Sequence, residues 1–176
     1  MIPRTLFSSE HETFRDSVRR FMDTEVKPND ERWQEQGYAD RDVWKKAGAN
    51  GFLCSSMPEE YGGSGADKLY SIILIEEQAR ANNSTLGFGL HSEIVAPYLN
   101  RYGSEVLKKK YLPKMAAGEQ IGAIAMSEPR AGSDLQSVQT SAIRKGDSSP
   151  ADAPTPCHPH RRNRVPGAGV PKPVPP

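Results

Sequence analysis

The sequence predicts a mainly α fold: a helical bundle followed by the first strands of an incomplete β domain and a disordered, proline-rich tail. Through residue 118, apolar side chains recur at helical spacing between capping residues. Residues 121–126 are a continuous small-apolar run of strand length, and residues 138–143 alternate as a second strand does. We therefore expect three parts: a helical domain (1–118), the start of a β domain (119–147) and the tail (148–176).

The first helix is predicted from the spacing of a capping box. The hydroxyl of Ser9 can accept the amide of Glu12, whose carboxylate can reach back to the start of the helix. Apolar residues then follow at helical spacing as far as Val26, with Arg15 and Arg19 among the charged residues on the opposite side. Pro28 is expected to end this amphipathic helix.

Two helices are predicted in the middle of the bundle. Asp40 is a candidate N-cap for a short helix that ends near Gly48 or Gly51. Residues 57–65 are rich in glycine, which predicts a loop. Asp67 then precedes a wide apolar block, which predicts a helix packed on most of its sides.

Two more helices complete the predicted bundle. One runs from about Leu90 through Tyr102, with Pro97 as a kink or a start point. The other is capped by Ser104 and closes at Gly118. The two predicted strands that follow cannot bury a sheet face by themselves, so the β domain is incomplete in this chain.

Charge and composition exclude several classes of partner. The chain carries a net charge of +1, with a basic tail and a slightly acidic body, which argues against nucleic-acid binding. Two cysteines imply no disulfide framework. No signal core, transit segment or long apolar run is present, so we expect no membrane span and a cytoplasmic location.

The tail differs sharply from the body. Nine of its twenty-nine residues are proline, and it contains no aromatic residue, Leu, Ile or Met. Such a segment buries too little apolar surface to offset its ordering entropy, so we expect it to be disordered. The alternative is a proline-rich linker, although such a linker would lead to another domain.

Residues 125–134 have the features of a ligand-binding loop that leaves a strand. A strand ending at Met126 and Ser127 would present backbone amides and a hydroxyl, and the small residues 131–133 let a ligand approach the backbone. Asp134 can accept nearby amides and hold the turn closed. These properties suit a flat heterocycle or a phosphate. An ordinary glycine turn between strands is the alternative on spacing alone.

The same residues resemble the signature of the acyl-CoA dehydrogenase family. Every position of the pattern small-apolar-Ser/Thr-Glu-x-x-small-Gly-Ser/Thr-Asp-x-x-small is matched from Ala125 to Ser137. The resemblance extends without a gap over residues 5–147, and it is strongest to the long-chain branch. Its other motifs are Pro58-x-x-Tyr61-Gly62-Gly63-x-Gly65, Glu76-Glu77-Gln78-Ala79-Arg80 and Tyr111-Leu112-Pro113-x-Met115-Ala116-x-Gly118.

The resemblance implies a binding site for FAD. Its cofactor-binding residues would be Ile124, Ala125, Met126, Ser127, Gly132 and Ser133. The amides of Met126 and Ser127 and the hydroxyl of Ser127 would meet the pyrimidine edge of the flavin, where donors favour the reduced ring. Ser133 would also bind substrate, since it would lie where the cofactor meets the pantetheine arm of the CoA thioester.

The resemblance also implies a reaction and partners. Family members dehydrogenate a medium- or long-chain acyl-CoA to the trans-2-enoyl-CoA, and the electrons pass to an electron-transferring flavoprotein. The catalytic glutamate and the tetramer contacts belong to a C-terminal helical domain with no counterpart here. We therefore assign no catalytic residue, since Glu128 is a structural loop residue in the family, and we expect no homotetramer and no activity from this chain alone.

Two alternatives to an active enzyme follow. The chain could be a non-catalytic remnant or a helical interaction module without flavin. The abrupt change of composition after Asp147, inside a predicted strand, leads to the hypothesis that residues 148–176 come from a frameshift or a sequencing slip. Another reading frame that lacks family-like sequence downstream would contradict that hypothesis.

The remaining polar residues have plainer interpretations. We expect His11 to be solvated in the first helical turn, and His91 to be a packed histidine with one hydrogen bond. Cys54 is predicted to be a small buried hydrophobe. Residues 157–160 hold one cysteine and two histidines in the proline-rich tail, and we expect no metal site there.

Overall fold

The computed structural model describes residues 5–124, 128, 131–139, 141–142 and 151–152. These residues divide into two compact units, Met1–Gly122 and Ala123–Pro176, and each is considered by itself. The predicted three-part division of the chain stays a prediction. The first unit is helical throughout its regular structure, which confirms the mainly α fold class.

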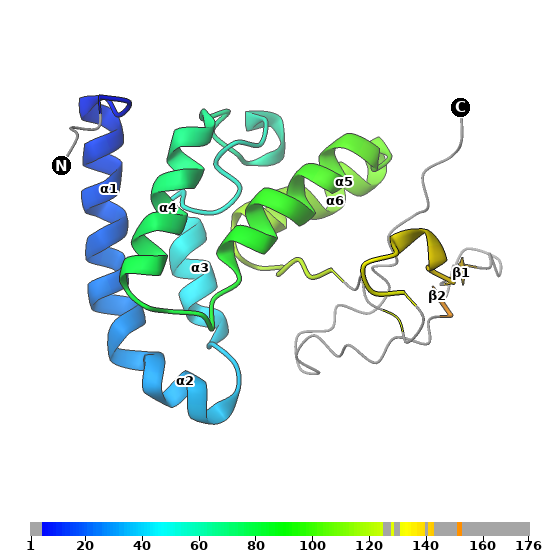
Figure 1. Ribbon diagram of the computed structural model, residues 1–176. Coiled ribbons are helices and arrows are strands. Elements are labelled where there is room, and N and C mark those ends of the chain that lie inside the picture. Colours follow the sequence, from blue (N-terminus) through cyan, green and yellow to red (C-terminus); the bar gives the residue numbers. More distant parts are fainter. Residues whose placement is uncertain (1–4, 125–127, 129–130, 140, 143–150, 153–176) are drawn as a thin grey trace. The chain divides into compact units, whose positions relative to one another are not determined.

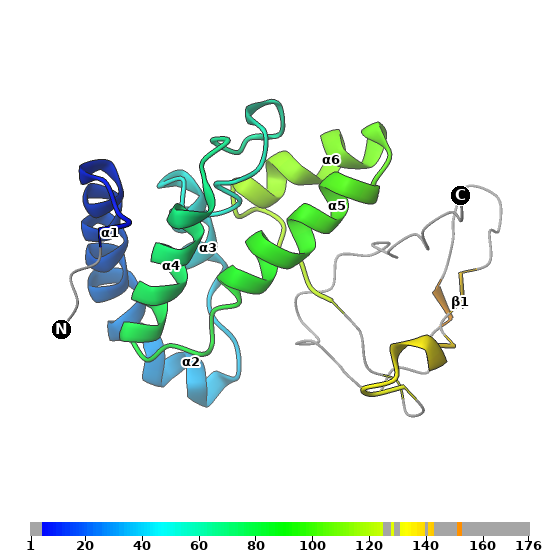
Figure 2. The ribbon, with the colours of Figure 1, turned by 45° about the horizontal axis from the view of Figure 1, so that its top comes forward.

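The first unit is a bundle of helices, in which residues 50–67 form a long connection that includes the 3₁₀ turn Glu59–Tyr61 (Figure 1). Helices α1 and α4 lie side by side, and α5 and α6 form a second pair, as both views show (Figure 2). The helices are α1 (Ser9–Phe21), α2 (Asp30–Gln36), α3 (Arg41–Ala49), α4 (Lys68–Arg80), α5 (Ala96–Tyr102) and α6 (Glu105–Ala116). Two π-helical segments, η1 (Met22–Val26) and η4 (Leu90–Val95), continue into their neighbours.

Helix α1 begins one residue earlier than the capping-box spacing predicted. Ser8, not Ser9, is the N-cap, with φ −78° and ψ 172°. The reciprocal partner is the ring of His11, whose Nδ1 accepts the amide of Ser8 at 3.1 Å, not the carboxylate of Glu12. An imidazole at the third position supplies the acceptor that the capping box needs, so the box forms without an acidic residue.

Pro28 does not end the helical path as predicted. It lies in the 3₁₀ turn Lys27–Asn29, which leads directly into α2. Proline is tolerated in a first turn, because the missing amide has no helical acceptor there. The chain turns instead at Gly37, which has φ +78° and closes α2.

Three of the predicted helix starts are confirmed, two with the predicted side-chain cap and one without it. Asp67 and Ser104 accept amides of the first turns of α4 and α6. Asp40 occupies the N-cap position of α3 without a side-chain cap, because its carboxylate pairs with Arg32. That pairing holds the pKa of Asp40 well below its usual range, with lesser help from neighbouring donors.

Helix α4 is not packed on most sides, contrary to the prediction from its apolar block. Ile72 and Ile75 are 42% and 46% exposed. Part of the buried face belongs instead to Ser71 and Glu77. Both polar side chains can be buried because each has a hydrogen-bond or ion-pair partner on a neighbouring element. The number of apolar residues in the sequence of α4 therefore overstated how much of the helix surface is packed.

Two hydrophobic clusters hold the first unit together. The larger is built on Trp33, Trp44 and Phe88 and joins α1 and the segments after it to α3 and α4. The smaller packs Met57 and Tyr61 against α5 and α6, and Leu112 and Met115 are its members from α6. Phe88 meets Trp44 edge-on at 4.8 Å.

The described part of the second unit contains little regular structure. It consists of the 3₁₀ turn Leu135–Ser137 and the strands β1 (Ser141–Ala142) and β2 (Ala151–Asp152), paired antiparallel with Ser141 opposite Asp152. The described residues of the first predicted strand, 121–124, lie outside any strand. Among the described residues of the second, 141 and 142 lie in a strand, whereas 138 and 139 do not. A strand needs a hydrogen-bonding neighbour, so apolar pattern alone is insufficient.

The predicted disordered tail contributes β2, while residues 153–176 lie outside the described residues. Among the helices that the structure describes, none has both the length and the hydropathy required to cross a bilayer.

Candidate functional site

The predicted flavin loop is only partly described. Ile124 is half-buried, and Gly132 and Ser133 are exposed. The predicted site residues Ala125, Met126 and Ser127 lie outside the described residues. The roles assigned to all six therefore stay predictions, and their setting can be examined at 124 and 131–134.

A tight backbone turn forms the base of this loop. The amide of Glu128 donates to the carbonyl of Ala131 at 3.0 Å, and the amide of Ala131 donates back to Glu128 at 3.1 Å. The carboxylate of Glu128 accepts the amide of Gln139 at 2.7 Å, and the residue is 8% exposed. Glu128 therefore ties the turn to the chain that follows it, and its assignment as a structural loop residue stays a prediction.

Asp134 closes the next turn in the way that the sequence predicted. Its carboxylate accepts the amide of Gln136 at 3.2 Å and the hydroxyl of Ser137. Its carbonyl also accepts the amide of Ser137 at 3.3 Å. These contacts leave Gly132 and Ser133 on a short segment held on both sides, at Ala131 and at Asp134.

The described residues fit the approach of a flat cofactor. Among the described residues, no atom would lie within 4 Å of a Cβ added to Gly132, so they leave open space beside its backbone. Ser133, the next residue along the chain, is exposed beside that space. A flavin would be held here by Ile124, Gly132 and Ser133 together with the predicted residues 125–127.

His91 lies in η4 of the first unit. The ring is fully buried in η4, and Trp44 contacts it edge-on at 5.3 Å. Its Nε2 lies 3.1 Å from the carbonyl oxygen of Met115, and its Nδ1 lies 2.8 Å from the amide nitrogen of Gly122. The prediction of a packed histidine is confirmed, but the ring makes two hydrogen bonds to backbone groups instead of the single bond that was expected.

Burial controls the protonation of this region. It lowers the pKa of His91 to about 4, although the hydrogen bond to the Met115 carbonyl opposes the shift. It also raises the pKa of the Cys54 thiol to about 12. Cys54 Sγ lies 3.7 Å from His91 Nε2, so a neutral thiol faces a neutral imidazole, and Cys54 is the buried residue that was predicted.

His11 is not solvated, contrary to the prediction. It is 8% exposed, packs 4.5 Å from the ring of Tyr70, and lies 3.4 Å from a carboxylate oxygen of Asp67 through Nε2. The burial arises because α4 covers the first turn of α1, which sequence position alone does not show.

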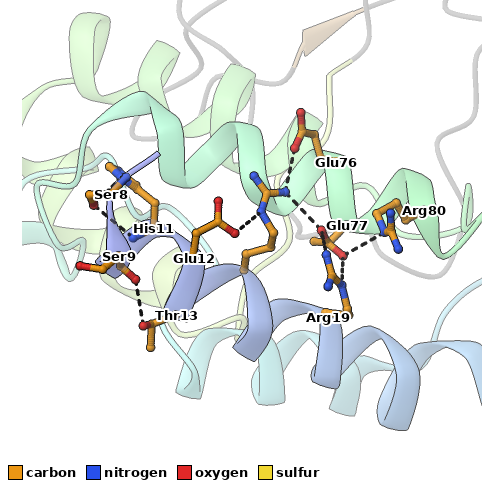
Figure 3. A network of polar contacts seen from close by, with 10 residues as sticks. Ser8, Ser9, His11, Glu12, Thr13, Arg19, Glu76, Glu77 and Arg80 are labelled. Atoms are coloured by element: carbon orange, nitrogen blue, oxygen red, sulfur yellow. Dashed lines mark hydrogen bonds and ion pairs between the residues drawn. The ribbon is translucent and has the colours of Figure 1, made fainter. Parts of the chain in front are cut away.

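A polar network between α1 and α4 was also missed from the sequence (Figure 3). Glu77 is almost completely buried, and Figure 3 shows Arg19 and Arg80 converging on it. Arg15, predicted on the solvent side, bonds both Glu77 and Glu76. The one signal in the sequence is an acidic pair inside an apolar helix, since a buried carboxylate requires a cationic partner.

The network keeps its carboxylate charged. Burial opposes ionisation of Glu77, but its hydrogen bonds to Arg19 and Arg15 outweigh that effect and lower its pKa. Its chemistry is therefore that of a fixed ion cluster that joins two helices. Within the described ranges, no group of three or more His, Cys, Asp or Glu is placed to hold a metal ion, and residues 157–160 lie outside them.

Comparisons with known proteins identify the family. The family model described as acyl-CoA dehydrogenase, N-terminal domain, matches residues 8–119. The mitochondrial long-chain specific acyl-CoA dehydrogenase of Mus musculus is 50% identical over 143 residues, which cover 81% of this chain and 33% of that protein. The chain thus spans about a third of the length of this curated relative.

Solved structures agree. The acyl-CoA dehydrogenase from Geobacillus kaustophilus has a TM-score of 0.80 and 43% identity, covering 86% of this chain and 40% of that one. An acyl-CoA dehydrogenase from Bacillus anthracis, complexed with FAD, has a TM-score of 0.73 and 38% identity, covering 80% and 24%. Since the family match covers more than half of the residues, this chain belongs to the acyl-CoA dehydrogenase family.

Proposed function

We propose that this chain supplies the helical domain and the flavin loop of an FAD-dependent acyl-CoA dehydrogenase. The reaction is the α,β-dehydrogenation of a medium- or long-chain acyl-CoA to its trans-2-enoyl-CoA. The observation that carries the proposal is the loop at residues 131–134, where a held turn exposes Gly132 and Ser133 beside open space. The identity to a long-chain specific relative supports the longer substrates.

The residues of this chain have binding and orienting roles in the proposal. Gly132 admits the cofactor close to the backbone, and Ser133 contacts both cofactor and thioester arm. FAD, when bound, supplies the acceptor for the substrate hydride. The proton-abstracting carboxylate is not assigned to any residue here, so the chain by itself is proposed to be inactive.

A chimera tests the proposal. Residues 5–147 would replace the matching segment of the mouse long-chain enzyme, and the purified protein would be examined for bound flavin by its visible absorbance. We expect a yellow protein. A folded chimera without flavin would contradict the proposal, and the unmodified mouse enzyme prepared in the same way is the control.

A second candidate function, a helical interaction module without flavin, is favoured by one observation. Leu90, Ile94, Tyr98 and Tyr102 are all exposed and recur every four residues along η4 and α5. Such a row forms one face of a helix and is typical of a surface that another protein covers. This function predicts a colourless chimera and a chain that associates with partners through that row.

The remaining expectations are part of the proposal. Electrons would pass to an electron-transferring flavoprotein, and the chain alone would not form the family's tetramer. The cytoplasmic location stays a prediction from the sequence, which immunofluorescence of the tagged chain would test.

A further inference from the structure

The two hydrogen bonds of His91 link three separate segments of the first unit. The ring comes from η4, the carbonyl of Met115 from the last turn of α6, and the amide of Gly122 from the chain that follows α6. Gly122 is also the last residue of the first unit. His91 therefore contacts the backbone where the chain continues towards residues 124–133.

The partners determine which nitrogen carries the proton. The amide of Gly122 can only donate, so Nδ1 must be the bare acceptor. The carbonyl of Met115 can only accept, so Nε2 must carry the hydrogen. A single neutral tautomer satisfies both bonds, whereas a doubly protonated ring would set two donors against each other at Gly122.

Packing restrains the same point independently. A Cβ at Gly122 would lie 2.8 Å from Cγ1 of Val95 and 3.0 Å from Cε of Met115. The backbone therefore runs closely over η4 and α6, with no room for a side chain. The hydrogen bond and the close approach together determine where this backbone lies.

We propose that His91 is a positioning residue, whose bare Nδ1 holds the amide of Gly122 and so fixes the last residue of the helical unit, from which the chain continues to the flavin loop. The importance for the loop rests on the proposed function, while the anchoring of Gly122 does not. His91 contacts neither cofactor nor substrate in this proposal, and it acts through the backbone of Gly122.

Two amide substitutions separate positioning from packing. In His91→Asn, the side-chain oxygen can occupy the place of Nδ1 and still accept the amide of Gly122. In His91→Gln, the side-chain amide reaches the place of Nε2 and can still donate to Met115, but nothing accepts at the Nδ1 position. Asn is the smaller side chain, so a role in packing alone would make His91→Asn the more damaged variant.

The readout is hydrogen exchange at the amide of Gly122, measured by NMR on the full chain without flavin and corrected for global stability from the slowest core amides. Losing one hydrogen bond predicts exchange about tenfold faster in His91→Gln, and a change of less than about threefold in His91→Asn. The reverse order, or equal protection in both variants, would overturn the proposal.

The wild-type chain gives a second test if a variant does not fold. The ¹⁵N chemical shifts of the His91 ring at neutral pH should show a bare Nδ1 and a protonated Nε2. The opposite tautomer would overturn the proposal. Both tests use the chain without flavin. A colourless chimera would therefore contradict the proposed function, while hydrogen exchange at the amide of Gly122 would still decide whether His91 anchors that residue.

Discussion

Arg19 of α1 and Glu77 of α4 form a two-bond ion pair, with Nε to Oε2 and Nη2 to Oε1 both at 2.9 Å. Parallel bonds of this kind fix the orientation of both groups as well as their distance. Arg15, one turn earlier on α1, bonds the same carboxylate at 3.2 Å. The buried Glu77 thus receives two cationic side chains of α1 and is one of the points at which α1 is joined to α4.

Removing the charge of Glu77 should destabilise the bundle. In Glu77→Gln, Arg19 loses the carboxylate with which it pairs, and the largely buried Arg15 loses one of its carboxylate partners. We therefore expect a loss of about 3 kcal/mol in the free energy of unfolding. The control is Asp23→Asn, because Asp23 pairs with Lys27 on the surface and should contribute less than about 1 kcal/mol. Urea unfolding followed by circular dichroism measures both, and equal losses would refute a special role for Glu77.

Stability should fall in acid in two stages. The pKa of His91 is lowered in the fold from 6.5 to about 4, so the unfolded chain binds its proton first as the pH falls. The free energy of unfolding should then drop by about 3 kcal/mol between pH about 6.5 and about 4. The pKa of Glu77 is also lowered, so its contribution is present above its unfolded pKa and is lost only as the pH falls through the folded value.

His91→Gln separates the two stages. That variant should lose the dependence between pH about 6.5 and about 4 and keep the more acidic one. The measurement is the denaturation midpoint in urea across this range of pH. An unchanged profile in the variant would show that His91 is not the titrating group.

Gly118 should tolerate no side chain. It has φ +71°, and an added Cβ would lie 2.1 Å from the carbonyl oxygen of Trp44. We expect Gly118→Ala to cost about 3 kcal/mol, from backbone strain and overpacking together. Gly37 is the matched control, because it has φ +78° and no atom of the described residues lies within 4 Å of an added Cβ. Gly37→Ala should therefore cost only about 1 kcal/mol. Thermal unfolding compares the two, and similar losses would mean that the contact with Trp44 relaxes.

Cys54 should resist thiol reagents in the folded chain. It is buried, and its pKa is raised to about 12, so almost no thiolate is present at neutral pH. With Cys157→Ser in the background, Cys54 is the only thiol of the chain. Labelling with an aromatic disulfide should be slow until urea unfolds the protein, and rapid labelling under native conditions would contradict the burial.

The sequence predicted helix positions better than it predicted helix faces. The caps at Asp67 and Ser104 are local hydrogen bonds, so spacing was enough to place them. The burial of Arg15 and His11 depends on α4, which lies more than fifty residues away, and no local pattern contains that contact. The exposure of Ile72 and Ile75 was missed for the same reason.

The candidate site shows a similar division. The closing role of Asp134 followed from the hydrogen-bonding capacity of a short acidic side chain after glycine and serine. The bond from Gly122 to His91 joins residues thirty-one apart, and the periodicity of η4 predicted only that His91 is packed. Residues 121–124, predicted to begin a strand, lie outside any strand, since a strand depends on a neighbouring strand that the pattern could not supply.

The most direct test of the central claim is reduction of the flavin in the chimera that carries residues 5–147. A long-chain acyl-CoA would be added without oxygen, and the visible flavin absorbance would be followed. The account predicts that the yellow colour is bleached in proportion to the substrate, and more readily by a long-chain than by a short-chain thioester. A chimera that holds flavin but is not bleached, while the mouse enzyme is, would contradict the account.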